Sequence, residues 1–352
     1  MKLVVLDTLA GDEQSEIFVY DESGRRLSNF RLGYVPELEY DASHNELVTA
    51  ETVIQKRLGR RCARFVLRGY DANTWKLRWE QETPRRPMYT GYPGRSRRVS
   101  VSPCSRYVYC LASTMVFRSL QDPGADDVFR LQVLRYDRET RTIETGRGSL
   151  ESCMVAFGVA GAGGAFYFHL SCDYPSTVAF GNFETEDLDW VRMDEIPARE
   201  HGERETVGSW FDATSETLYC VNGRGDLFGA RRPPAASDAL GRLPLEDGES
   251  VALQQIHGAG DWLFIGVSAD HLERSLSLSS RMHCISRGEP AGQRHLELPF
   301  PVLNFVAAGA GAVIAGVSPY ARAVCLIDAA TGRVVRSIEG VGKTPAEVLV
   351  LP

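Results

Sequence analysis

Short runs of alternating apolar and polar residues recur along the whole chain, and turns rich in Gly, Pro, Asp and Ser separate them. The wider apolar spacing of a long helix is nearly absent. Alternation with a period of two, bounded by turn residues, is typical of β-strands. The sequence therefore predicts an all-β protein.

A hairpin pattern of an apolar strand, a turn and a polar strand recurs seven times. The last apolar residues of the seven copies are Tyr20, Tyr70, Tyr136, Phe180, Phe228, Ile285 and Ile327. Their mean spacing is about 51 residues, which fits four strands and their turns, the size of one propeller blade. We predict one seven-bladed β-propeller with four-stranded antiparallel blades over residues 1–352.

The two ends of the chain both carry a strand pattern, at residues 2–6 and 346–351. If these strands pair, one blade is built from both ends, which closes the ring without leaving an open sheet edge. Two stretches, 117–127 and 230–249, depart from the compact spacing and contain Pro and small residues. We expect both to be surface insertions.

The composition is that of an ordinary soluble globular protein, with 43% hydrophobic residues, 24% charged residues and a net charge of −7. The acidic excess argues against a nucleic-acid partner. No apolar run approaches the roughly 20 residues of a membrane-spanning helix. The first residues lack the apolar core of a secretory signal, so we expect a cytoplasmic protein, periplasmic only if a leader was removed.

No linear motif for catalysis or metal binding occurs. The seven histidines lack metal-site spacing, there is no Cys-x-x-Cys, and the common nucleophile and phosphate-loop fingerprints are missing. We predict no catalytic set, metal site or cofactor in this chain, although histidines from several blades could still gather at the axis. Arginines cluster at 57–64 and 85–98, either as a solvated surface or for an acidic protein, peptide or carboxylate.

From Gly33 to Pro103 the chain shows a distinctive order of pieces. Gly33-Tyr34-Val35-Pro36 is followed by Ala50-Glu51-Thr52-Val53, a basic segment, Thr90-Gly91-Tyr92-Pro93 and Ser100-Val101-Ser102-Pro103. This order resembles the heavy chain of methylamine and aromatic amine dehydrogenases, a seven-bladed propeller. The heavy chain of that family has no cofactor and supports a light chain that carries tryptophan tryptophylquinone.

The resemblance implies roles for particular residues. Tyr34 would border the entrance to the partner's quinone, with Tyr89 and Tyr92 nearby, although a tyrosine packed under its own turn is the alternative. Cys153 and Cys172 would form a disulfide, whereas a reducing cytosol would keep both thiols free. The candidates for the partner or substrate entrance are Tyr34, Tyr89, Tyr92, Arg57, Arg61, Arg97 and Arg98.

Three functions follow from these observations. The first is a non-catalytic platform, like the amine dehydrogenase heavy chain, for a separate quinone- or peptide-bearing catalytic partner. The second is a cytoplasmic scaffold in a biosynthetic or peptide-modifying complex that has no amine dehydrogenase activity. The third is an enzyme with a pocket at the propeller axis. The first two predict a protein or peptide partner.

Overall fold

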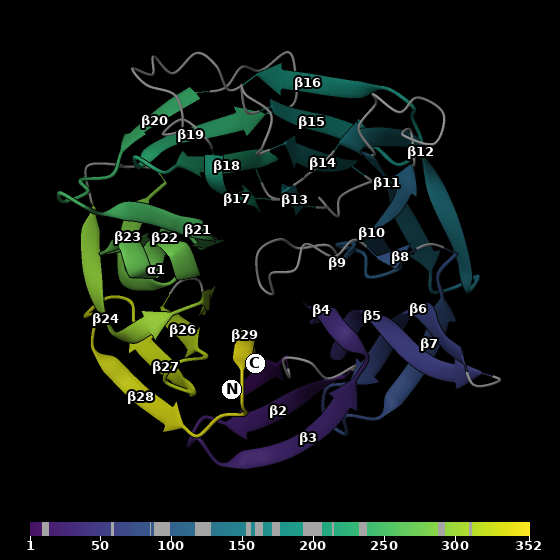
Figure 1. The fold of residues 1–352 in the computed structure, drawn as a ribbon, viewed down its shortest axis with the longest axis horizontal. Coiled ribbons are helices and arrows are strands. Elements are labelled where there is room, and N and C mark those ends of the chain that lie inside the picture. Colours follow the sequence, from purple (N-terminus) through teal and green to yellow (C-terminus); the bar gives the residue numbers. More distant parts are fainter. Residues whose placement is uncertain are drawn as a thin grey trace.

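The computed structural model describes residues 1–8, 14–57, 60–84, 86–87, 99–116, 128–152, 156–158, 165–170, 177–192, 206–212, 215–231, 238–287, 293–309 and 312–352. Seven antiparallel sheets stand around one axis, each running from the axis outward (Figure 1). The prediction of a seven-bladed propeller with four-stranded blades is confirmed. Blade 3 alone among the described blades has a fifth short strand.

The strands of the first three blades are given from the axis outward. Blade 1 contains β29 (Pro345–Leu351), β1 (Lys2–Asp7), β2 (Ser15–Asp21) and β3 (Arg26–Leu32). Blade 2 contains β4 (Tyr34–Asp41), β5 (Glu46–Arg57), β6 (Arg60–Asp71) and β7 (Leu77–Glu82). Blade 3 contains β8 (Arg86–Pro87) and β9 (Val99–Val101), both paired with β10 (Tyr107–Val116), then β11 (Val128–Asp137) and β12 (Thr142–Ser152).

The other four blades follow the same order. Blade 4 contains β13 (Ala156–Gly158), β14 (Ala165–Leu170), β15 (Thr177–Asn182) and β16 (Leu188–Arg192). Blade 5 contains β17 (Thr206–Asp212), β18 (Thr217–Asn222), β19 (Asp226–Arg231) and β20 (Asp238–Arg242). Blade 6 contains β21 (Ser250–Ala259), β22 (Trp262–Ser268), β23 (Ser279–Ser286) and β24 (Arg294–Val302). Blade 7 contains β25 (Asn304–Ala308), β26 (Val313–Ser318), β27 (Ala323–Asp328) and β28 (Val334–Glu339).

The third strand of several blades ends in an aspartate whose side chain caps the following turn. Asp71 accepts hydrogen bonds from the backbone N–H groups of Asn73 and Thr74, and Asp137 accepts from those of Glu139 and Thr140. Such turns need a short acceptor side chain at their first position. The capping explains why an aromatic residue followed by Asp recurs in the hairpin pattern.

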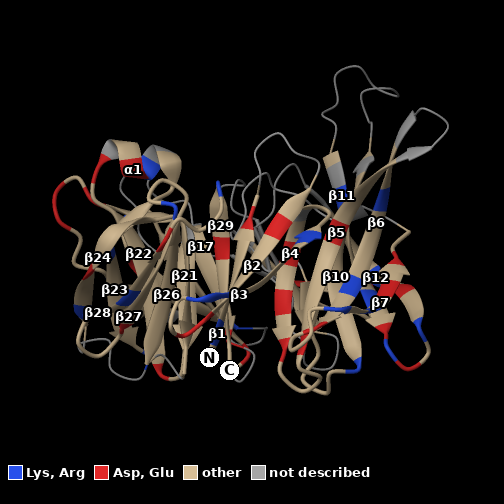
Figure 2. Ribbon diagram, turned by 90° about the horizontal axis from the view of Figure 1, so that it is seen from below, with Lys and Arg blue, Asp and Glu red and all other residues tan. Residues whose placement is uncertain are grey.

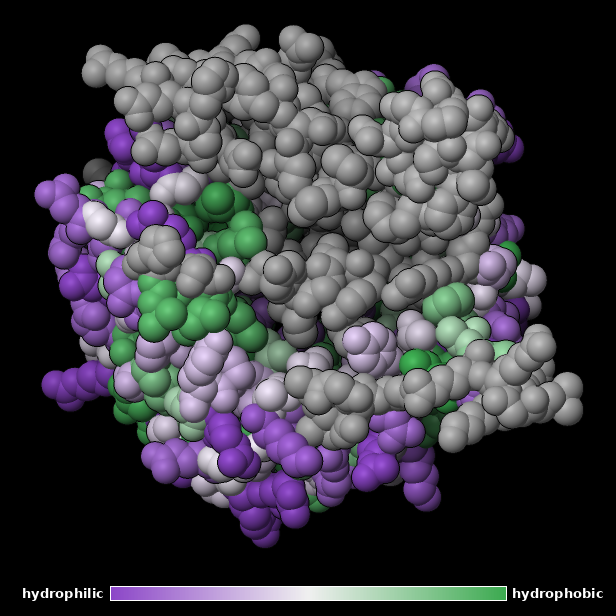
Figure 3. Space-filling model, viewed as in Figure 1, coloured by the Kyte–Doolittle hydropathy of each residue, from purple (hydrophilic) through white to green (hydrophobic). Residues whose placement is uncertain are grey.

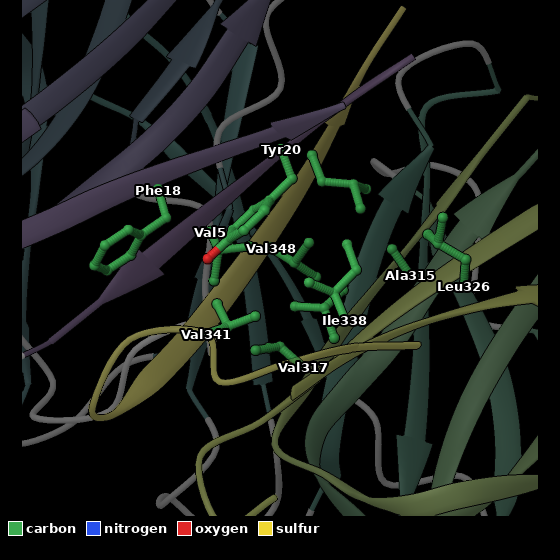
Figure 4. Close-up of a cluster of buried hydrophobic side chains, with 11 residues drawn as sticks. Val5, Phe18, Tyr20, Ala315, Val317, Leu326, Ile338, Val341 and Val348 are labelled. Atoms are coloured by element: carbon green, nitrogen blue, oxygen red, sulfur yellow. The ribbon is translucent and has the colours of Figure 1, made fainter. Parts of the chain in front are cut away.

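The ring is closed by the two chain ends, as predicted. Strand β29 pairs with β1 from Leu351 opposite Lys2 to Pro345 opposite Asp7. A buried apolar cluster then joins blade 1 to blade 7, and Figure 4 shows side chains of both blades pointing into it. Its members include Val5, Phe18, Tyr20, Ala315, Val317, Leu326, Ile338, Val341 and Val348.

A latch of hydrogen bonds reinforces the closure where β1 ends. The buried carboxylate of Asp7 accepts from the backbone N–H of Lys343 at 2.5 Å, from the backbone N–H of Thr344 at 2.8 Å and from the Thr344 hydroxyl at 3.0 Å. Gly342 precedes these donors with φ +59°, and a Cβ there would lie 2.1 Å from Asp7 Oδ2. Only glycine fits this close approach in a left-handed conformation.

The ring has two distinct faces. Both chain ends lie on the lower face in the side view of Figure 2, and the short helix α1 (His271–Leu276) and the distal ends of β5 and β6 lie on the upper face. No helix among the described residues is long and apolar enough to cross a membrane.

The two predicted insertions have different outcomes. The stretch 117–127 lies outside the described residues. The expectation of a surface loop over 230–249 is wrong in part, because Ala230 and Arg231 end β19 and Asp238–Arg242 form β20, the outermost strand of blade 5. An outermost strand has one face in solvent, so its small and polar residues can pair in the sheet without the apolar pattern of a core strand.

Candidate functional site

Tyr34 is the first residue of β4, the innermost strand of blade 2 (Figure 1), and so lies at the opposite end of that strand from the turn between Asp41 and Glu46. It is half-buried and pairs across the sheet with Thr52, after which a bulge precedes the next pair, Glu37 with Ala50. Gly33 sits just before it, where a Cβ would approach the Thr52 carbonyl oxygen to 2.6 Å. A glycine is therefore required for Tyr34 to occupy this position.

A buried carboxylate supports the backbone beside Tyr34. Glu51 is 1% exposed and accepts from the Gly33 N–H at 2.6 Å, Thr49 Oγ1 at 2.5 Å, Arg68 Nη1 at 2.8 Å and Tyr70 Oη at 3.2 Å. Burial and then the charge of Glu51 raise the pKa of Tyr70 well above its ordinary value, so its hydroxyl remains a donor. With its charge partnered and its oxygens hydrogen-bonded, Glu51 is a structural support.

Strands β5 and β6 continue beyond the rest of blade 2 as a two-stranded ribbon. The pairing of β4 with β5 reaches Thr52, and that of β7 with β6 reaches Val66. Beyond these points, residues 53–57 and 60–64 pair with each other, and no other described strand pairs with them. We call this segment, residues 53–64, the upper ribbon.

The upper ribbon carries five basic residues and no acidic residue: Lys56, Arg57, Arg60, Arg61 and Arg64. Its register sets like charges directly opposite one another, Arg57 across from Arg60 and Lys56 across from Arg61. Directly opposed like charges destabilise a pair of strands. Arg64, at the base of the ribbon, donates from Nη2 to Glu80 Oε1 at 2.5 Å.

Three of the predicted entrance candidates lie in strands of blade 2, Tyr34 in β4, Arg57 in β5 and Arg61 in β6. Tyr34 pairs with Thr52, five residues before Arg57 along β5, and a shared entrance for the three stays a prediction. Tyr89, Tyr92, Arg97 and Arg98 lie outside the described residues, as do Cys153 and Cys172, and the predictions for them stay predictions.

A polar cluster that the sequence did not reveal joins blades 2 and 3 on the lower face. Arg138 donates to Asp41 Oδ2 at 2.5 Å and to Glu46 Oε2 at 2.9 Å, and both carboxylates are buried. Ser105 Oγ donates to Asp41 Oδ1 at 2.9 Å, and His44 Nδ1 lies 2.9 Å from Asp41 Oδ2. We call this group the interblade clamp.

The interblade clamp contains Ser, His and Asp but lacks the arrangement of a nucleophilic triad. Ser105 donates to the carboxylate of Asp41, whereas a triad serine donates to the imidazole. Burial raises the pKa of Asp41, but the hydrogen bonds from Arg138 and Ser105 outweigh it and the pKa lies below its usual value. A permanently charged Asp41 is suited to holding Arg138 and, through it, the two blades together.

A similar arginine–aspartate contact joins blades 5 and 6. Arg287, just after β23, donates from Nη1 to Asp212 Oδ2 at 2.5 Å, as Arg138, just after β11, donates to Asp41. Each guanidinium also lies over a tryptophan, Arg287 over Trp210 and Arg138 over Trp79. The only sequence signal was an arginine directly after the third strand of a blade, paired with an aspartate in the inner turn of the preceding blade.

Within the described part of the chain, no group of three or more His, Cys, Asp and Glu side chains could hold a metal ion. His283 is buried and faces His295, with ring centroids 6.4 Å apart. Burial lowers the pKa of His283, so it is neutral at pH 7.

Comparisons with known proteins identify the fold and no specific family. No family model and no curated protein matches the chain. Among solved structures, the β-propeller domain of Cps50 (Swd1) from Myceliophteria thermophila is similar at 11% identity, covering 89% of each chain with a TM-score of 0.56. Sqt1 of Saccharomyces cerevisiae is similar at 11% identity, with 95% of this chain and 82% of that chain covered and a TM-score of 0.54.

The periplasmic gluconolactonase PpgL of Pseudomonas aeruginosa is similar at 12% identity, over 99% of this chain and 98% of that chain, with a TM-score of 0.54. Similarity at this identity shows the β-propeller fold alone, and the seven blades follow from the sheet topology. The propeller implied by the amine dehydrogenase resemblance is confirmed, and membership of that family stays a prediction.

Proposed function

We propose that this protein is a non-catalytic docking platform whose upper ribbon receives an acidic segment of a partner protein. The observation that carries the proposal is the strand register, which places Lys56 opposite Arg61 and Arg57 opposite Arg60 in a ribbon that pairs with no other described strand. A two-stranded hairpin is marginally stable alone, and repulsion across it weakens it further. Carboxylates bound between the strands would remove the repulsion and supply the acceptors that guanidinium groups favour.

A protein partner fits better than a nucleic acid. The chain as a whole carries a net charge of −7, which repels a long polyanion, while a short acidic segment meets only the local basic charge of the ribbon. Tyr34 on the same blade adds an aromatic residue of the kind enriched at protein interfaces.

The resemblance to the amine dehydrogenase heavy chain supports a catalytic partner in particular. In that form of the proposal, the chain itself holds no cofactor, and a small partner subunit brings a tryptophylquinone to the vicinity of Tyr34. The scaffold of a peptide-modifying complex differs only in the partner, which would then carry no such quinone.

The docking proposal is tested with defined probes and a matched pair of variants. Binding of a fluorescent 15-residue Glu-rich peptide is measured by anisotropy for the wild type, for Arg57→Glu/Arg61→Glu and for Arg25→Glu/Arg26→Glu, which makes the same charge change on the lower face. We expect the ribbon variant alone to weaken binding, by about tenfold or more, and we expect affinity to fall with added salt. Equal losses in both variants, or tighter binding of a single-stranded oligonucleotide, would contradict the proposal.

The identity of the partner is tested by purifying the tagged chain from its native cell and recording mass and visible absorption spectra. A small protein with a quinone-like chromophore, lost in the Arg57→Glu/Arg61→Glu variant, supports the catalytic form. A colourless partner lost in the same variant supports the scaffold. A metal or cofactor bound to the chain alone would instead indicate an enzyme with its own pocket.

A further inference from the structure

Helix α1 exposes its apolar residues in place of burying them. Leu272 and Leu276, one turn apart, are 66% and 37% exposed, and Leu253 on the bulged upper part of β21 is 38% exposed. Figure 3 shows apolar areas over α1 and over β21 on this face. We call these three leucines the leucine patch.

Local hydrogen bonds hold α1 in place. The Asp270 carboxylate caps the helix by accepting from the Glu273 N–H at 2.8 Å, and Glu273 Oε2 accepts from the Ala269 N–H and from Ser280 Oγ, both at 2.8 Å. At the other end Ser277 adopts the left-handed conformation, with φ 56°.

Two more contacts fix the helix to its surroundings. The Leu278 N–H donates to the Glu273 carbonyl oxygen at 2.8 Å, and Arg274 Nη2 donates to the Gly248 carbonyl oxygen at 2.8 Å. A six-residue helix is too short to be stable by itself, so these contacts explain why it persists. These contacts fix the backbone that carries the exposed side chains of Leu272 and Leu276.

Acidic residues surround the leucine patch. Figure 2 shows acidic positions on and beside α1. The segments that flank it carry the acidic residues Glu246, Asp247, Glu249, Asp270 and Glu273. They carry only two basic residues, Arg274 and Arg281, and Arg281 is engaged by Glu246 at 3.0 Å and Glu249 at 2.7 Å.

We propose that the leucine patch is a second docking surface, which binds a basic amphipathic segment of a protein partner. The leucines would take the apolar face of such a segment, and the net negative charge of the flanking segments would attract its Lys and Arg side chains. This surface is on blade 6 and is independent of the upper ribbon on blade 2. The upper face therefore has two docking regions of opposite charge.

The test uses a fluorescent 14-residue helical peptide with Leu on one face and Lys on the other, and a matched peptide with Glu in place of Lys. We expect the Lys peptide to bind and the Glu peptide not to bind. Leu272→Ser/Leu276→Ser should raise the Kd for the Lys peptide about tenfold. The control Leu27→Ser/Leu77→Ser changes two exposed leucines of the outermost strands and should leave the Kd unchanged.

Charge is tested in the same way. Asp247→Lys should weaken binding of the Lys peptide, whereas Glu22→Lys on the lower face and Arg57→Glu/Arg61→Glu on the ribbon should not. Equal loss of affinity in the patch and control variants would overturn the proposal. So would a sedimentation experiment in which the wild type dimerises and Leu272→Ser/Leu276→Ser is monomeric, because the occupant would then be a second copy of the chain.

Discussion

The Asp7 latch gives the sharpest test of how the ring is held closed. Asp7→Ala removes the acceptor for two backbone N–H groups and one hydroxyl at a site where the carboxylate is 1% exposed. A buried donor left without an acceptor costs about 1–3 kcal/mol, and partial relaxation around the two N–H groups leaves a total of about 3 kcal/mol. Thermal unfolding entropy near 2.1 cal/mol/K per residue converts this to a fall in Tm of about 4 °C for a chain of this length.

The matched control is Asp21→Ala. Asp21 also accepts two backbone N–H groups and a hydroxyl, from Ser23 and Arg25, but in an exposed turn where water can replace it. We expect a much smaller fall in Tm, measured by calorimetry and by the urea midpoint. If the two variants lose the same stability, burial of the latch is unimportant and the reasoning is refuted.

A double variant separates the latch from general damage to β1. Gly342→Ala should destabilise the protein because the new Cβ meets the Asp7 carboxylate and the φ of +59° is strained. In Asp7→Ala/Gly342→Ala the 2.1 Å approach to Asp7 Oδ2 is gone and the nearest approach is to the Cβ of residue 7 at 3.2 Å, so the combined loss should be smaller than the sum of the single losses. Additive losses would mean that the two residues do not interact.

Three further predictions concern stability. Burial lowers the pKa of His283 in the folded protein, so below about pH 6.5 the unfolded chain binds a proton at this residue more readily than the folded protein does. The urea midpoint should therefore fall between pH 7 and 5.5. His283→Gln should flatten this dependence, and His295→Gln should not. Arg138→Ala removes the cation that the buried carboxylates of Asp41 and Glu46 share, leaving Glu46 only the longer contact with Arg78, and should cost about 3 kcal/mol in urea unfolding. A loss no larger than that of Arg25→Ala, an exposed arginine, would contradict this. Deleting residues 345–352 should lower the unfolding temperature of the whole ring, and a chain that keeps its Tm would show that β29 is dispensable.

The sequence was sufficient for the fold because propeller blades repeat. The aromatic-Asp endings at Tyr20, Tyr70 and Tyr136 mark the third strand of a blade, and the terminal apolar runs predicted the closing pair β1 and β29. The error at 230–249 arose because Pro233-Pro234 and small residues outweighed the weak pattern of β20, which needs only backbone pairing on its inner side.

The site was less predictable because its contacts join distant residues. Arg138 lies 97 residues from Asp41, and Thr344 lies 337 residues from Asp7, so neither pair has a spacing that a linear motif could reveal. Helix α1 could have been found, since Asp270 followed three residues later by Glu273 is a helix-capping signature. The basic ribbon was visible as an arginine cluster, but the opposed pairs depend on the register of β5 and β6.

The position of β29 also has a consequence for biosynthesis. The innermost strand of blade 1, β29, is synthesised long after its partner β1. At translation rates of about 5–20 residues per second, the roughly 300 residues between β3 and β29 take about 15–60 s to make. Throughout that time one backbone edge of β1 is unpaired. The side chains of Val4 and Leu6, which the finished ring buries completely, lack part of their packing. Until β29 is made, the nascent chain therefore has an unpaired strand edge at which another chain could pair.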